Sequence, residues 1–173
     1  MQREEILTLL KTVNLNENVI KHVVAVEKLS IETAKLILKN APDFKIDLKL
    51  ISDGALLHDI GRSVTHSIKH AIEGVKIARK YGFNEKILSI IENHIGAGIS
   101  KEDAKELGLP VKNYFPLTIE EKVVANSDNL HSGDTRTGID GLYNRLLNQG
   151  NQKAAQRVLD LYNEISELAG IKL

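Results

Sequence analysis

The spacing of the apolar residues limits this chain to helices. In most segments, apolar side chains recur at intervals of three and four residues, which places them on one face of an α-helix. The stretch VIKHVVAVEKLSIETAKLILK, residues 19–39, shows the pattern most fully. No segment alternates apolar and polar residues as a half-buried strand does, so folds that bind nucleotides on a sheet lose their support. We therefore predict an all-α protein.

Residues that favour helix ends divide the chain into consecutive helices. Asn16 and Asn84 are suited to cap the helices that follow them, and Asp47 and Ser100 open two more. Thr118, with a glutamate three residues later, is typical of a capping box. The predicted helices span residues 3–13, 17–38, 47–59, 67–81, 84–95, 100–108, 118–130, 139–148 and 151–169.

Composition excludes several classes of function. The absence of cysteine excludes disulfides, thiolate metal sites and a cysteine nucleophile. The apolar runs are too short for a membrane span, and the start MQREEILTLLKTV is too charged for a signal peptide, so we expect a cytoplasmic protein without membrane contact. A net charge of zero provides no basic field for long nucleic acid, but a small phosphorylated ligand remains open. A homo-oligomer also remains open.

A His-Asp pair ends one of the predicted apolar helices. His58 and Asp59 follow the run GALL, and Gly61 lets the backbone turn away and leaves room for a ligand. Neighbouring residues on a helix point about 100° apart, so the two side chains reach around a single object more easily than they contact each other. A divalent metal is such an object, because imidazole and carboxylate both suit it. Taken alone, the pair also fits a surface C-terminal cap.

Four further residues of the same chemistry occur on other helices. His22 has apolar neighbours, which also fits a satisfied core histidine, and His94 ends its helix just before the sequence GAG. A carboxylate near the end of an apolar helix, as at Asp128, is costly to bury unless it is paired or bound to a metal. Nitrogen and oxygen ligands without sulfur suit one filled metal site, or two adjacent metals bridged by a carboxylate. The candidate ligands are His22, His58, Asp59, His70, His94 and Asp128.

The order His22, His58-Asp59, Asp128 resembles the HD-domain superfamily of metal-dependent phosphohydrolases. LLHDIG, residues 56–61, is similar to the HDIG form of the family's central motif, and the resemblance covers about residues 18–145. It implies one helical bundle of about seven to nine helices over residues 1–173, with C-terminal helices packed on the core. It also implies a metal held by this four-residue set.

Two other segments are similar to the dinuclear branch of that superfamily, which includes ribonuclease Y-type domains and symmetrical diadenosine tetraphosphate hydrolases. KHAIEGVKIARKYG with ILSIIENHIG resembles the segment that supplies ligands to a second metal, and NSDNLHSGDTR with LYNRLL resembles the segment after the last aspartate. The resemblance implies that His70 and His94 hold the second metal and that Asp59 bridges both. This chain departs from the pattern at Arg62, where a lysine is usual, and at Ile95, where a histidine is common.

The implied activity is metal-dependent hydrolysis of a phosphomonoester or phosphodiester bond in a nucleotide-like small molecule. The implied cofactor is one or two divalent ions of Fe, Mn, Ni, Co or Zn. Asp59 and Arg62 are the predicted catalytic residues, with His66 as a proton donor or a phosphate contact. Arg62, Lys69 and Arg136 are predicted phosphate ligands, although Arg62 and Arg136 also fit solvated surface charges. The alternative is a regulatory module that binds a nucleotide or a metal without turnover.

Overall fold

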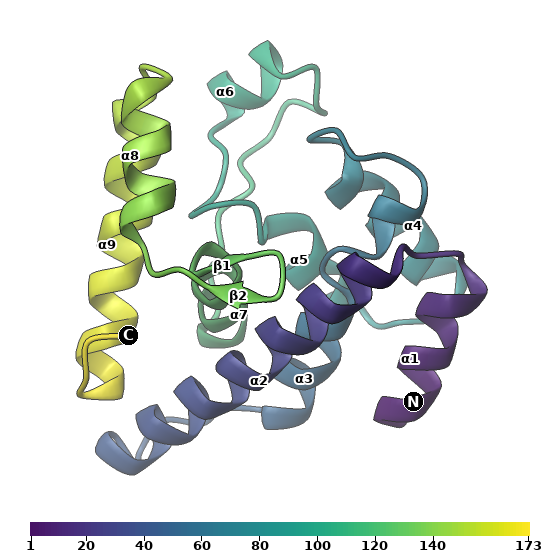
Figure 1. Cartoon of the computed structure of the whole chain (residues 1–173), viewed down its shortest axis with the longest axis horizontal. Helices are drawn as coiled ribbons and strands as arrows, with labels where there is room; N and C mark the ends of the chain where they lie inside the picture. The colour runs from purple at the N-terminus through teal and green to yellow at the C-terminus, as the bar shows by residue number, and fades with distance from the viewer.

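The computed structural model describes residues 1–173, and it confirms the all-α prediction (Figure 1). Nine α-helices and one 3-10 helix account for the regular structure, apart from one very short hairpin. The elements are α1 Arg3–Thr12, α2 Glu17–Asn40, α3 Leu48–Leu57, η1 Ile60–Ser63, α4 His70–Lys80, α5 Glu85–Asn93, α6 Lys101–Glu106, α7 Ile119–Asn129, β1 His131–Ser132, β2 Thr135–Arg136, α8 Asp140–Asn148 and α9 Gln152–Ala169.

The predicted helix starts are confirmed in detail. The side chains of Asn16, Asp47, Asn84, Ser100 and Thr118 each accept a hydrogen bond from a backbone N–H in the first turn of the helix that follows. These caps satisfy donors that a helix cannot satisfy itself, which is why the short polar residues mark the boundaries so well.

The structure differs from the predicted elements at three places in the backbone. The helix predicted for residues 67–81 begins only at His70, because Thr65 and Ser67 form a hydroxyl turn before it. The helix predicted for 47–59 ends at Leu57, and the chain tightens into η1. The chain also contains a hairpin in which His131 pairs with Arg136. Strands of two residues are too short to show alternation in a sequence.

The long helix α2 lies at the centre of the packing and contacts α3, α7 and α9. Ile90 of α5 packs directly over Gly54 of α3, where any side chain would displace it. Helices α8 and α9 run side by side along the flank of the molecule that lies opposite α1 (Figure 1). No helix has both the length and the apolar character that crossing a membrane requires. The packing brings the end of α3 to the middle of the structure, between α2, α4, α5 and α7.

Candidate metal centre

Six imidazole and carboxylate groups meet at the end of α3. His58 and Asp59 follow the last turn of this helix, and the other four groups come from α2, α4, the end of α5, and α7. His58, Asp59, His70 and His94 are buried, whereas His22 and Asp128 keep some exposure to solvent. The structure thus brings together all six residues that the sequence suggested as ligands, and the surface-cap interpretation of His58 is wrong.

The four histidines of this cluster are oriented by backbone carbonyl groups. In each ring Nδ1 donates a hydrogen bond to a carbonyl oxygen at 2.7–2.8 Å; the acceptors are Gly133 for His22, Ala55 for His58, Ser67 for His70 and Ile91 for His94. Because Nδ1 carries the proton, Nε2 of each neutral ring is left with a free lone pair. All four Nε2 atoms lie within 4 Å of a carboxylate of the cluster, which is the arrangement that metal-binding histidines need.

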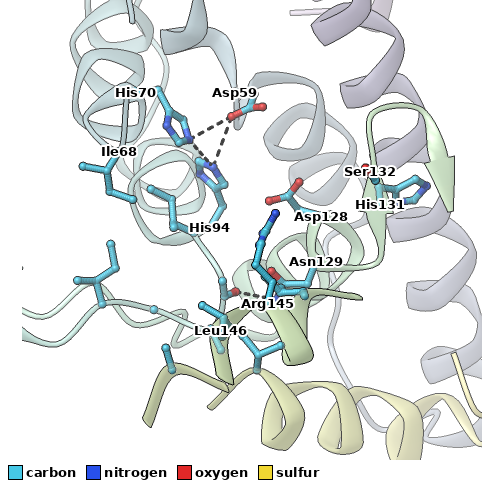
Figure 2. A pocket seen from close by; sticks show the side chains of 18 of the residues that line it. Asp59, Ile68, His70, His94, Asp128, Asn129, His131, Ser132, Arg145 and Leu146 are labelled. Atoms are coloured by element: carbon cyan, nitrogen blue, oxygen red, sulfur yellow. Dashed lines mark hydrogen bonds and ion pairs between the residues drawn. The ribbon is translucent and has the colours of Figure 1, made fainter. Parts of the chain in front are cut away.

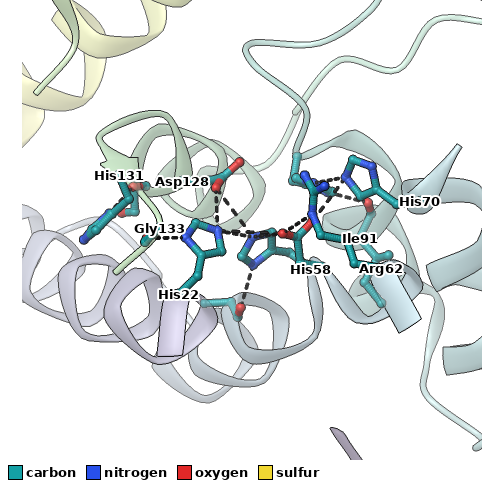
Figure 3. Close-up of polar contacts among 12 residues, drawn as sticks. His22, His58, Arg62, His70, Ile91, Asp128, His131 and Gly133 are labelled. Atoms are coloured by element: carbon teal, nitrogen blue, oxygen red, sulfur yellow. Dashed lines mark hydrogen bonds and ion pairs between the residues drawn. The ribbon is translucent and has the colours of Figure 1, made fainter. Parts of the chain in front are cut away.

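The cluster has two halves (Figure 3). In the first half, Nε2 of His22 lies 3.0 Å from Oδ1 of Asp128 and 3.3 Å from Nε2 of His58. In the second half, Nε2 of His70 lies 3.1 Å from Nε2 of His94 and 3.2 Å from Oδ1 of Asp59. The other oxygen of Asp59, Oδ2, is 3.8 Å from Nε2 of both His22 and His58. Asp59 therefore directs one carboxylate oxygen toward each half.

The donor set fits divalent cations. Oδ1 of Asp59 is buried and has no hydrogen-bond partner, which is costly for a carboxylate oxygen unless a cation satisfies it. The Nε2 atoms of His70 and His94 lie 3.1 Å apart, so the lone pairs of the two neutral rings repel each other, and a cation between them would remove the repulsion. Imidazole and carboxylate without thiolate suit first-row divalent metals. We conclude that the cluster has the chemistry of a metal-binding centre.

The charges of the cluster are strongly coupled. Burial alone would raise the pKa of Asp59, but the charge of His58 and the close approach of His70 and His94 hold it well below its usual range. Asp128 likewise has a pKa lowered by hydrogen bonds from His22 and His58, against the opposing effect of burial. Burial lowers the pKa of His58, yet the Asp59 and Asp128 carboxylates outweigh it and raise the value to about 9. Burial dominates at His94 and lowers its pKa. Both carboxylates are therefore ionised at neutral pH.

Two glycines allow the second half to assemble. A Cβ on Gly61 would collide with the backbone carbonyl of His70 and with the backbone nitrogen of Gly74. A Cβ on Gly74 would in turn press on Ile91 and approach the backbone of Gly61. Because both positions lack side chains, η1 lies directly against the first turn of α4. This contact brings His70 to Asp59.

A cavity of about 860 Å³ opens over the metal centre (Figure 2). Its volume is near the upper end of the roughly 300–1,000 Å³ of small-molecule sites. Arg62 and His66, predicted to act in catalysis, both line this cavity. Nε of Arg62 donates to Oδ2 of Asp59 at 2.5 Å. Lys69 and Arg136, predicted as phosphate ligands, are exposed and do not line it.

Three features of the site lie outside the set of residues predicted from the sequence. Arg145 of α8 and Arg157 of α9 line the cavity. Arg145 lies in the LYNRLL segment that resembles ribonuclease Y-type domains, whereas nothing near Arg157 in the sequence marks it as a site residue. The carbonyl of Gly133 orients His22 from the turn of the hairpin, and its φ of 60° is one that glycine adopts without strain. The glycine in the sequence HSGD is the signal that could have revealed this turn.

Fold and site together define an all-α domain with a histidine–aspartate metal-binding cluster at the base of a cavity. The chain matches the HD domain family over residues 19–133, and it belongs to this family. The match begins just before His22 and ends at Gly133, so it includes every residue of the metal centre. Helices α8 and α9 lie beyond the matched region.

Three proteins with similar sequences show which members of the family this chain resembles. The uncharacterized protein MJ0778 of Methanocaldococcus jannaschii is 45% identical over 97% of this chain and 99% of its own length. A tRNA (cytidine(56)-2'-O)-methyltransferase of Picrophilus torridus is 41% identical over 96% of this chain, which spans only 47% of that enzyme. Ribonuclease Y of Acidothermus cellulolyticus is 41% identical over 45% of this chain and 15% of its own length. The similarity to ribonuclease Y expected from the sequence is thus confirmed.

Proposed function

We propose that this chain is a metal-dependent phosphohydrolase that cleaves a phosphomonoester or phosphodiester bond of a nucleotide-like small molecule. The observation that carries the proposal is the position of Asp59. Its two oxygens are directed at two separate groups of histidines, at the base of a cavity that is large enough for a nucleotide. The proposed cofactor is one or two ions of Fe, Mn, Ni, Co or Zn.

Divalent ions in such a cluster polarise phosphoryl oxygens and supply an activated water. The remaining work falls to the side chains. Asp59 and Asp128 stay ionised at neutral pH, because their histidine neighbours hold both carboxyl pKa values low. The carbonyl contacts of the histidine Nδ1 atoms fix the rings in one tautomer and one orientation. The site is therefore organised before the substrate arrives.

Arg62 and His66 are the proposed contacts to the reacting phosphate. Nε of Arg62 is held by Asp59, which leaves the terminal guanidinium nitrogens available to a phosphate oxygen in the cavity. The exposed imidazole of His66 lines the cavity and is suited to donate a proton to the leaving group. The same cavity supports a small phosphorylated ligand as the binding partner.

The names of the relatives favour nucleotide chemistry. Ribonuclease Y and tRNA (cytidine(56)-2'-O)-methyltransferase are both named for reactions on RNA. The chain spans about half of the methyltransferase, so that enzyme's activity belongs to a protein with a further region. The similarity supports a nucleotide-like substrate for this domain without assigning methyl transfer to it.

The test is a hydrolysis panel with the purified protein in the presence of each candidate metal. The panel contains nucleoside monophosphates, 2′,3′-cyclic nucleotides, dinucleoside polyphosphates and a chromogenic phosphodiester, with Asp59→Asn as the matched inactive variant. We expect turnover of at least one class by the wild type and none above background by Asp59→Asn. Absence of turnover by the wild type with every metal would refute the enzymatic proposal and favour the regulatory alternative.

A further inference from the structure

The metal centre occupies only one wall of the cavity. The opposite wall is formed by the α8–α9 hairpin, from which Leu142, Arg145 and Leu146 of α8, and Ala154, Arg157 and Val158 of α9, line the cavity. Figure 2 shows Arg145 between this hairpin and the metal cluster. The hairpin lies outside residues 19–133, the region that matches the HD domain family.

Arg145 is the one arginine of the cavity without an acidic partner. Arg62 is paired with Asp59, and Arg157 is paired with Asp103 at 3.1 Å. The side chain of Arg145 makes no hydrogen bond or ion pair with another residue, and it is exposed to the solvent of the cavity. A guanidinium in this position provides a fixed positive charge with several free donors.

Arg157 adds a second set of donors to the same wall. Its Nε is buried and has no hydrogen-bond partner. The contact with Asp103 and the position of its guanidinium 5.8 Å from the centre of the Phe115 ring hold this side chain in place. Asp103 offsets the charge of Arg157, so the net positive charge of this wall comes from Arg145.

We infer that the α8–α9 hairpin forms an anion subsite with Arg145 as its principal ligand. This inference rests on the proposed function, and it implies that the substrate carries a second phosphate. The metal centre and Arg62 would hold the phosphate that reacts, whereas Arg145 lies on a different wall and is free to bind a second anion. Leu142 and Leu146 provide apolar surface beside it, which suits a nucleobase or sugar. The substrate class is a small nucleotide with two separated phosphates, such as a nucleoside bisphosphate or a dinucleotide.

The direct test measures the equilibrium binding of probes that cannot be hydrolysed. The metal-loaded protein is titrated with α,ω-alkane bisphosphonates with three to six methylene groups, and with the matching alkyl monophosphonates. We expect the best bisphosphonate to bind at least about tenfold more tightly than its monophosphonate, as one additional charge-assisted contact provides. The optimal chain length reports the separation of the two subsites.

Three variants assign that preference to Arg145. Arg145→Ala is expected to abolish the preference for two phosphonates, while its affinity for the monophosphonates stays within about twofold of the wild-type value. Arg145→Lys is expected to keep part of the preference, since the charge remains but the bidentate geometry is lost. Lys153→Ala removes one positive charge from the exposed side of the same hairpin and is expected to keep the full preference.

Failure of this inference is distinguishable from failure of the proposed function. Equal affinity of the wild type for both kinds of probe, absence of binding, or an undiminished preference in Arg145→Ala would overturn the subsite. Loss of monophosphonate binding in Arg145→Ala would also overturn it, because Arg145 would then act on the reacting phosphate. A preference that depends on Arg145, in a protein that hydrolyses nothing in the panel, would leave the subsite standing and remove the enzymatic proposal.

Discussion

The Nε2 atoms of His70 and His94 lie 3.1 Å apart, although both rings carry their protons on the opposite nitrogen, Nδ1. Two lone pairs at this distance repel. The Nε2 atoms of His22 and His58 form a second close pair at 3.3 Å, in which His58 of the metal-free protein is protonated because its pKa is about 9. Between the two pairs lies Asp59, whose buried Oδ1 has no hydrogen-bond partner. Together these contacts fit a cluster that binds divalent cations.

Arg62 is expected to support metal binding as well as substrate binding. Because its Nε holds Oδ2 of Asp59, Arg62→Ala should lower metal affinity by about 10–100-fold, the range typical of residues that orient metal ligands. Arg62→Lys should lose less, since a charge remains near the carboxylate. Competition with a fluorescent metal chelator measures the change, and Arg79→Ala, an exposed arginine on α4 away from the cavity, is the control. Unchanged affinity in Arg62→Ala would contradict this role.

Gly61 is expected to tolerate no side chain. The Cβ of Gly61→Ala would meet backbone atoms of His70 and Gly74, which cannot rotate away, so we expect destabilisation of about 1–3 kcal/mol or more and weaker metal binding. Gly141→Ala in α8 is the control, because a Cβ there meets no neighbouring atom and alanine favours a helix by up to about 1 kcal/mol. Urea denaturation of both variants measures the difference. Equal midpoints for the two would show that the contact between η1 and α4 is not needed.

The metal-free protein is expected to lose stability in mildly alkaline solution. The folded-state pKa of His58 is about 9, above its ordinary value of 6.5. A raised pKa stabilises the folded state fully below the unfolded value, and this contribution disappears as the pH rises from 6.5 to 9. Metal affinity should rise over the same range, because the metal displaces the His58 proton.

Thermal denaturation at several pH values tests this prediction. After treatment with a chelator, Tm should fall from pH 6.5 to 9, and the fall should be absent in His58→Asn and reduced in the metal-loaded protein. A metal-free wild type whose Tm is constant or rises over this range would be inconsistent with a protonated His58.

Local chemistry explains what the sequence revealed about the fold. Asn84 and Thr118 mark helix starts because each cap depends only on residues within one turn. The six candidate ligands were found for a similar reason, since each is a chemically unusual residue at a helix end or on an apolar face. His70 shows the limit, because its helix begins three residues later than periodicity suggested, at a turn built from hydroxyl groups.

The features that were missed depend on contacts between distant segments. Arg145 and Arg157 look like ordinary charges on amphipathic helices, and only the packing of the α8–α9 hairpin turns them toward the cavity. Gly133 contacts His22 across 111 positions of the chain, and its carbonyl carries no signal in the sequence. Arg136 shows the opposite relationship, because it is near Asp128 in the sequence but does not line the cavity.

The most direct test of the metal centre is elemental analysis of the purified protein combined with its rate of hydrolysis. The position of Asp59 between two groups of histidines predicts two divalent ions per chain in the wild type and one in a His70→Ala, His94→Ala double variant. Asp59→Ala should lose both the metal and the turnover. An Asp59→Ala protein that keeps the wild-type metal content and the wild-type rate would contradict the central role given to this carboxylate.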